Sequence, residues 1–179
     1  MRILQVIDAL EVGGAEKITV MISNLLKKKN IDVSVMLLVS DGVLINQLNS
    51  EIPIYRLKRS ARFSLKAMKR YKIILSEFDI IHVHLKHNFR YTQLVKKLFK
   101  IEGSKVVFHN HSHVFSPKKN RIKLLKDTLF KTIFKPQYYI GVNKDICQWA
   151  NHYLRIPQEH VYLLPNTITK SEVNEAISK

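Results

Sequence analysis

Short apolar runs alternate along this chain with longer segments in which apolar residues recur at helical spacing. Most of the runs are almost continuously apolar, which is typical of parallel strands buried on both faces. The runs predict strands at residues 3–7, 33–39, 54–57, 80–84, 105–109, 138–142 and 161–164, and the longer segments predict helices at 15–29, 43–49, 63–78, 89–100, 121–134 and 144–153. This alternation predicts an α/β fold with a single Rossmann-like, doubly wound and mostly parallel sheet.

Length and composition indicate how the chain is organised. A chain of 179 residues with 46% apolar residues suits one domain with a sizeable core. We expect residues 1–166 to form the Rossmann-like domain, and residues 167–179, which lose the apolar pattern, to form a C-terminal tail or the start of an interdomain linker. The first apolar run is too short for a signal peptide, and no window approaches the roughly 20 apolar residues of a membrane span.

The charge of the chain is strongly positive. Thirty Lys and Arg residues against fourteen Asp and Glu residues leave a formal net charge of +16, and the excess is concentrated in residues 52–76 and 118–135. Such a field suits a polyanion, either nucleic acid or an anionic membrane, although a merely solvated face has the same composition. Cys147 is the only cysteine, which excludes a disulfide framework and favours a reducing compartment.

Two adjacent glycines separate the first predicted strand from the first predicted helix. Gly13 and Gly14 allow a ligand to approach the backbone, and the helix that follows presents free N–H groups and the positive end of its dipole. This arrangement suits a phosphate or a sugar diphosphate. A tight turn between strand and helix uses the same residues, so the pair alone is a weak signal.

Histidines gather at the ends of two predicted strands. They are His82, His84 and His87 at one strand, and His109, His111 and His113 at the next. In a Rossmann-like order these strands neighbour the first one, so the imidazoles would converge on the glycine loop at the ligand-binding edge. A zinc site is one interpretation, since His-x-His is a ligand spacing, but no carboxylate pattern completes a metallohydrolase set. The others are structural hydrogen bonding and, which we favour, a polar ligand site.

The chain resembles the N-terminal, acceptor-side domain of the family-four retaining glycosyltransferases, which have the GT-B fold. The motifs that carry the resemblance are GGAE at 13–16, DIIHVH at 79–84, VVFHNH at 106–111, YIGVN at 139–143 and VYLLPN at 161–166. Together they cover essentially the whole chain, and the second His-x-His is most similar to the capsule and exopolysaccharide branch. Thr167 stands where the family normally has a glycine.

The resemblance implies a reaction and the residues that perform it. The implied donor-diphosphate residues are Gly13 and Gly14, the acceptor-binding residues are Glu16, His84 and Asn110, and the catalytic residues are His109 and, as second candidate, His111. The reaction would transfer a hexosyl group from a nucleotide sugar to a hydroxyl of a lipid-linked saccharide in polysaccharide biosynthesis. We expect no metal ion or other cofactor, because helix dipoles and basic side chains would stabilise the diphosphate.

The family also has a second Rossmann-like domain that binds most of the nucleotide sugar. This chain ends where that domain would begin, so we expect a C-terminal donor domain or a partner chain to complete the enzyme, and little or no transfer by the isolated chain. The alternatives are a non-catalytic scaffold and a basic α/β domain that binds membranes or nucleic acid. Nucleic acid is the less favoured partner, because the sequence has no helix-turn-helix spacing, zinc finger or aromatic-studded strand.

Residues 63–78 predict an amphipathic helix with one basic face. At 100° per residue, an apolar arc for core packing contains Phe63, Ala67, Met68, Tyr71, Ile74, Leu75 and Phe78. Leu65 and Ile73 lie instead among the cations of the opposite face. The residues expected to dock on an anionic leaflet are Arg62, Lys66, Lys69 and Arg70. This predicts a cytoplasmic protein that is peripheral at the inner face of the cell membrane.

Overall fold

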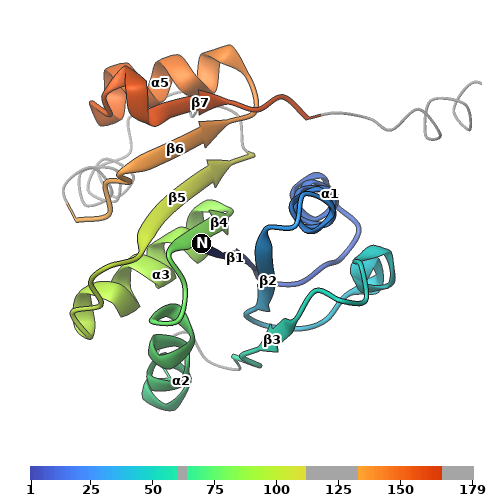
Figure 1. Ribbon diagram of the computed structural model, residues 1–179. Coiled ribbons are helices and arrows are strands. Elements are labelled where there is room, and N and C mark those ends of the chain that lie inside the picture. Colours follow the sequence, from blue (N-terminus) through green and yellow to red (C-terminus); the bar gives the residue numbers. More distant parts are fainter. Residues whose placement is uncertain (60–63, 112–132, 167–179) are drawn as a thin grey trace, which may run out of the picture.

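The computed structural model describes residues 1–59, 64–111 and 133–166. Within them, seven parallel strands form one sheet in the order β3-β2-β1-β4-β5-β6-β7 (Figure 1). The strands are β1 (Arg2–Ile7), β2 (Asp32–Leu37), β3 (Ile54–Arg56), β4 (Ile80–His84), β5 (Lys105–Asn110), β6 (Tyr138–Gly141) and β7 (Val161–Leu163). The helices are α1 (Gly14–Lys28), α2 (Leu65–Leu75), α3 (Lys86–Leu98) and α5 (Lys144–Leu154), with 3-10 helices η1 (Val43–Gln47) and η2 (Gln158–His160). The predicted Rossmann-like α/β fold is confirmed, and the sheet is entirely parallel.

Most described elements begin and end within three residues of their predicted bounds, but two differ in kind. The segment 43–49 forms the 3-10 helix η1 instead of an α-helix, because five residues after Gly42, whose φ is +88°, are too few to propagate i→i−4 bonds. Helix η2 was not predicted. Helix α2 begins after Ser64, whose Oγ accepts the Ala67 N–H at 3.3 Å as an N-cap. Arg62, Phe63, His113, most of the predicted helix 121–134 and the tail 167–179 lie outside the described residues.

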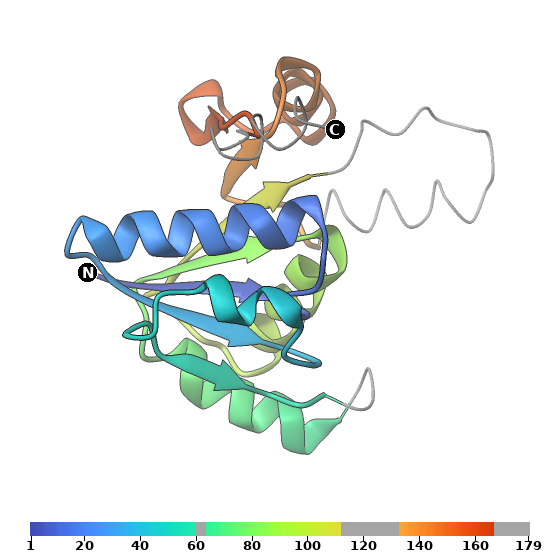
Figure 2. The same cartoon turned by 90° about the vertical axis from the view of Figure 1, so that its right-hand side faces the viewer.

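The strand order reverses between β1 and β4, at the centre of the sheet. From β1 the chain runs through α1 to β2 on one side, and after β3 it returns through α2 to β4 on the other side. Helix α1 packs on one face of the sheet, whereas α2 and α3 pack on the opposite face (Figures 1 and 2). In open α/β sheets, ligands bind beyond the carboxyl ends of the strands at such a reversal.

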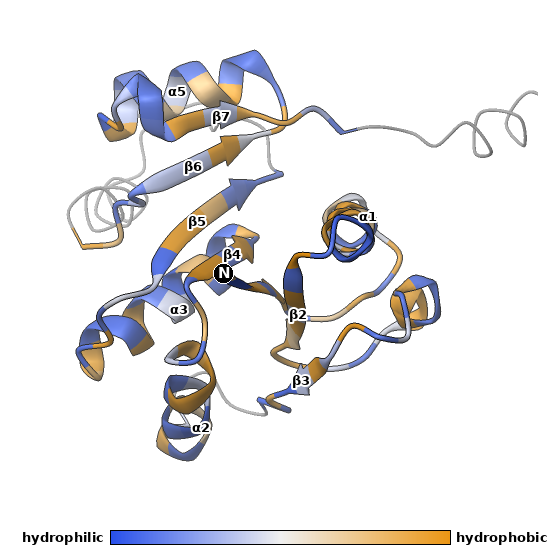
Figure 3. Ribbon diagram, in the orientation of Figure 1, coloured by the Kyte–Doolittle hydropathy of each residue, from blue (hydrophilic) through white to orange (hydrophobic). Residues whose placement is uncertain are grey.

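Two apolar layers stabilise these packings. Ile3 and Ile7 of β1 face α1, and Leu4 and Val6 face α2 and α3, because successive side chains of a strand point to opposite faces. Figure 3 accordingly shows mostly hydrophobic strands between helices of mixed hydropathy. The apolar arc predicted for α2 is buried at Met68, Tyr71, Ile74, Leu75 and Phe78. That part of the amphipathic prediction is therefore confirmed.

Candidate functional site

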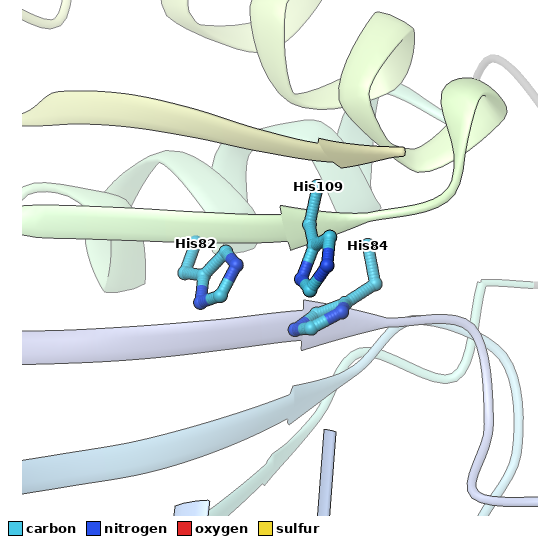
Figure 4. Close-up of side chains that lie close together, drawn as sticks. All are labelled: His82, His84 and His109. Atoms are coloured by element: carbon cyan, nitrogen blue, oxygen red, sulfur yellow. The ribbon is translucent and has the colours of Figure 1, made fainter. Parts of the chain in front are cut away.

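Four histidines meet where β4 and β5 reach the carboxyl edge of the sheet. Strand β4 lies between β1 and β5, as the sequence predicts, and the parallel register sets His84 beside His109 and His82 beside Gln5. Because residues two apart in a strand share a face, His82 and His84 point to the same side, with His109 next to them (Figure 4). His111 follows β5 directly. The convergence of these four imidazoles is therefore confirmed, whereas His87, predicted beside them, pairs with Asp8 instead. Their convergence on the glycine loop stays a prediction.

The rings pack directly against one another. Ring centroids are 4.5 Å apart for His82 and His84, 5.3 Å for His82 and His109, and 4.0 Å for His109 and His111. His82, His84 and His109 are buried, whereas His111 is partly exposed. The sequence predicted histidines that line a ligand site. In the structure three of these four histidines are instead buried in the interior.

A chain of hydrogen bonds fixes the protonation of His84. Its Nε2 lies 2.8 Å from Gln5 Oε1, a carboxamide oxygen that only accepts, so this nitrogen carries the proton. Nδ1 of His84 is then an acceptor, and it receives the Nε2–H of His111 at 3.0 Å. Gln5 was missed in the sequence, although a polar residue inside the apolar run 3–7 was a signal. We call Gln5, His84 and His111 the imidazole relay.

Burial keeps the whole cluster uncharged at neutral pH. Loss of hydration lowers the pKa of His82 to about 3, with a smaller contribution from the nearby His111. The same cause lowers the pKa of His109 to about 2 and that of His111 to about 4. The pKa of His84 is lowered too, by burial and then by the neighbouring imidazoles. Neutral imidazoles can donate, accept or bind a metal ion, but they offer no positive charge to a diphosphate.

A second polar group lies at the same edge and includes charged residues. Asp8, just after β1, accepts from His87 Nε2 at 2.6 Å and from Arg59 Nη2 at 3.4 Å. The Arg59 guanidinium also stacks over the Tyr91 ring, 4.4 Å from its centroid. The sequence places His87 among the strand-end histidines but does not predict that His87 and Arg59 both pair with Asp8. We call Asp8, His87 and Arg59 the edge triad.

An open cleft of about 610 Å³ adjoins the edge triad. Its lining consists of Leu37, Val39, Ser40, Asp41, Arg56, Lys58 and Arg59. Arg56 Nε donates to Asp41 Oδ1 at 2.7 Å, and Arg59 pairs with Asp8 outside the lining, so the excess positive charge of the lining is that of Lys58. The cleft therefore carries a positive charge at the carboxyl end of β2 and β3.

The two glycines of the loop between β1 and α1, Gly13 and Gly14, have different surroundings. Gly13 is the N-cap of α1, and a Cβ there would lie 2.2 Å from Glu16 Oε2, so the Glu16 carboxylate covers this residue. Gly14 has no heavy atom within 4 Å of the position where a Cβ would be, so its surface is open. The open side of the loop is the part that a ligand can reach without displacing the protein.

The predicted membrane residues lie away from these groups, on the outer face of α2. Lys66, Lys69 and Arg70 are exposed there, while Arg62 is outside the described residues. Leu65 and Ile73 are 64% and 63% exposed among these cations.

Asn110 is half-buried at the end of β5, where its Nδ2 donates to Tyr139 Oη at 2.8 Å. None of the described helices is long and apolar enough to cross a bilayer.

Comparisons with known proteins give the class of this molecule. The sequence model of Glycosyltransferase Family 4 matches residues 12–172. A glycosyltransferase from Rickettsia africae has a similar structure at 14% identity and a TM-score of 0.64, over 99% of this chain and 48% of that one. HepE of Anabaena, solved with UDP and glucose, is similar at 17% identity and a TM-score of 0.65, over 99% and 50%. An α-glucosyltransferase solved with UDP and DNA is similar at 14% identity and a TM-score of 0.56, over 98% and 45%.

The fold and these likenesses define one half of a GT-B glycosyltransferase. The chain belongs to Glycosyltransferase Family 4, since the family model covers most of its length. It spans about half the length of the solved structures that it resembles. No curated protein sequence matched it.

Proposed function

We propose that this chain is the acceptor-binding half of an enzyme that transfers a hexosyl group from a nucleotide sugar to a saccharide hydroxyl with retained configuration. The proposal is supported by the topology: the glycine loop, the imidazole relay and the edge triad all lie at or after the carboxyl ends of strands of one parallel sheet, in a chain of this family. HepE binds UDP and glucose, which supports a nucleotide-sugar donor. Polysaccharide biosynthesis of the capsule or exopolysaccharide type is the proposed setting.

The donor diphosphate is proposed to bind at Gly13 and Gly14. The start of α1 offers backbone N–H groups and a positive dipole end, and the open surface of Gly14 lets phosphate oxygens approach. Glu16 has to turn away from Gly13 when an anion binds, and its carboxylate is then available to an acceptor hydroxyl. This mode of binding needs no metal ion at the diphosphate.

Gly14→Ala tests this binding mode. The added methyl meets no protein atom within 4 Å, so the fold should be unchanged, while the methyl fills the space that the diphosphate needs. We expect transfer by the complete enzyme to fall at least about tenfold, equivalent to about 1.4 kcal/mol, with unchanged thermal unfolding. Wild-type transfer by a folded Gly14→Ala protein would contradict the proposal.

The histidine proposed to face the transferred sugar is His111 rather than His109. His109 and His84 are fully buried, so either would reach a substrate only after its cover moved, whereas His111 is partly exposed. His84 then acts as a positioning residue, because it accepts the His111 proton, and Asn110 borders the acceptor side. His111→Ala should lower kcat with little change in KM, and Gln5→Leu should lower it less. Equal kcat values in the wild-type, His111→Ala and Gln5→Leu enzymes would exclude the imidazole relay from the reaction.

The acceptor is proposed to carry a phosphate, as a lipid-linked saccharide does. The positive cleft with Arg56, Lys58 and Arg59 suits such an anion, and it adjoins the edge triad. Lys58→Glu should raise KM for a lipid-diphosphate acceptor several-fold and leave KM for the nucleotide sugar unchanged. The matched control is Lys100→Glu, a reversal of the same kind at the turn after α3.

The outer face of α2 is proposed to bind the inner leaflet of the cell membrane. Exposed Leu65 and Ile73 beside Lys66, Lys69 and Arg70 combine apolar insertion with attraction to anionic lipid, worth about 1 kcal/mol per cation. Sedimentation with anionic and neutral vesicles tests this: the chain should pellet only with anionic ones, and a Lys66→Glu/Lys69→Glu protein should stay in solution. Addition of DNA to the same assay tests the alternative polyanion.

A donor-binding domain, in the same protein or in a partner chain, is proposed to complete the enzyme. The isolated chain should therefore show no measurable turnover with any of a panel of nucleotide sugars. Turnover should appear when the sequence encoded downstream of Lys179, or a neighbouring open reading frame, is co-expressed. If no such partner restores transfer, the chain is a non-catalytic scaffold.

A further inference from the structure

Three of the clustered histidines have the spacing of a metal site. One ring nitrogen each of His82, His84 and His109 lies within 4.8 Å of the other two (Figure 4). The site is built from two neighbouring strands, so its geometry is set by the β4–β5 register rather than by a flexible loop. A Zn²⁺ ion binds imidazole nitrogens at about 2.0–2.1 Å, and small rotations of the three rings would bring the nitrogens to that distance.

The hydrogen bonding of the cluster is incomplete in a way that points to a ligand. Nε2 of His82 and both ring nitrogens of His109 are buried without a hydrogen-bond partner among the described residues. Buried polar atoms are nearly always paired, because an unpaired one costs stability. Two of the three members of the set therefore have nitrogens that a bound cation would satisfy.

We propose that His82, His84 and His109 bind one Zn²⁺ ion on the α1 face of the sheet, as a structural site that joins β4 to β5. The set contains imidazoles and neither thiolate nor carboxylate, which favours zinc and its neighbours in the first transition series over calcium or magnesium. This proposal replaces the expectation, drawn from the sequence, that the chain binds no metal. It does not depend on glycosyl transfer, and a bound ion and the intact imidazole relay exclude each other, because both use the lone pair of His84 Nδ1.

The imidazole relay shows how His84 would be held as a ligand. Ligating histidines usually donate their second nitrogen to a protein oxygen, and His84 Nε2 already donates to Gln5 Oε1. The lone pair of His84 Nδ1 now receives the His111 N–H, so a cation at that lone pair displaces His111. His111 lies against the cluster and is partly exposed, so its displacement is the route by which an ion would reach the buried set.

The test is metal binding by the purified chain after removal of metal with a chelator. Titration of Zn²⁺ against a chromophoric chelator should give one ion per chain, and Co²⁺ should give the strong visible absorption of a four-coordinate nitrogen site. His82→Gln and His109→Gln should each weaken binding by at least about tenfold, the lower end of what the loss of even an outer partner costs. The matched control is His152→Ala, which removes an exposed imidazole on α5.

Two results would overturn the proposal: no bound Zn²⁺ in the wild-type chain, or wild-type affinity in both cluster variants. If the variants fail to fold by circular dichroism, the ring ¹⁵N resonances of the wild-type histidines decide instead. Zinc should then shift His82, His84 and His109. Shifts confined to exposed histidines such as His87 or His152 would show that the ion binds elsewhere and would exclude this site.

Discussion

His84 and His87 lie three residues apart in the chain, yet their surroundings are opposite. His84 is the last residue of β4, fully buried, and its two partners are the neutral side chains of Gln5 and His111. His87 is in the first turn of α3, its side chain is 54% exposed, and its partner is the Asp8 carboxylate. Leu85 between them has a φ of +70°, which turns the chain from strand to helix. The direction of the side chain, and not its nearness to the strand end, decides which imidazole is neutral and which can pair with a charge.

The largest expected effect is a difference in the free energy of unfolding between substitutions on the two faces of β5. Phe108 is buried against Phe89 and Tyr139, so Phe108→Ala should lower the free energy of unfolding by about 3–5 kcal/mol. His109→Leu, on the other face, removes unpaired nitrogens at similar volume and should change it by less than about 1.5 kcal/mol. Urea unfolding with a chelator present measures both. If His109→Leu is as destabilising as Phe108→Ala, the His109 nitrogens have partners.

Acid should destabilise the chain through the buried histidines. Their pKa values in the folded state lie below the unfolded value of about 6.5, at about 3, 2 and 4 for His82, His109 and His111. The unfolded state therefore binds more protons, and stability falls as the pH drops from about 6.5 to about 4. The slope should approach about 1.4 kcal/mol per pH unit for each group.

Urea unfolding at successive pH values, again with a chelator, measures this slope. His109→Leu should make the slope shallower by about 1.4 kcal/mol per pH unit, the contribution of one group. A wild-type slope in His109→Leu would show that His109 is not protonated on unfolding in this range.

The imidazole relay should contribute less to the free energy of unfolding than the apolar core does, but more than the edge triad. Gln5→Leu removes the acceptor of His84 Nε2 and leaves a buried N–H unpaired, so it should cost about 1–3 kcal/mol. A loss below about 0.5 kcal/mol for Gln5→Leu would indicate that His84 finds another acceptor.

The smallest effect is expected at the edge triad. His87→Ala removes a partly exposed pair with Asp8 and should change stability by less than about 1 kcal/mol, a change that salt reduces further. Its effect should be on KM for the acceptor instead. A loss of stability as large as that of Gln5→Leu would show that the edge triad stabilises the fold as much as the imidazole relay does.

The sequence alone predicts most of the fold, because periodicity reports burial. Continuous apolar runs identified all seven strands, and the arc from Met68 to Phe78 identified the buried face of α2. The convergence of the histidines followed from the strand order of such folds. The prediction for segment 43–49 was less accurate, because so short a helix between Gly42 and Leu48 leaves no strong helical pattern in the sequence.

The environment of the candidate site could not be predicted in the same way. Alternation puts His82 and His84 on one face, but whether that face is open or covered depends on what packs over β4 and β5, and in the structure both side chains are buried. The pairing of Asp8 with Arg59 joins residues that are 51 positions apart. Long-range contacts of this kind arise from packing, and local sequence patterns do not encode them. The residues were therefore found, while their burial and partners were not.

The oxygen of Gln5 has an effect well beyond its own contact. By accepting from His84 it obliges His84 to accept from His111, and His111 is then left with its proton on the inward nitrogen and a bare lone pair on Nδ1. A glutamine in the middle of the first strand thus sets the acid–base polarity of an imidazole two strands away. Exchanging that oxygen for an N–H would reverse the direction of both hydrogen bonds, and the buried Nδ1 of His111 would carry a proton in place of its lone pair.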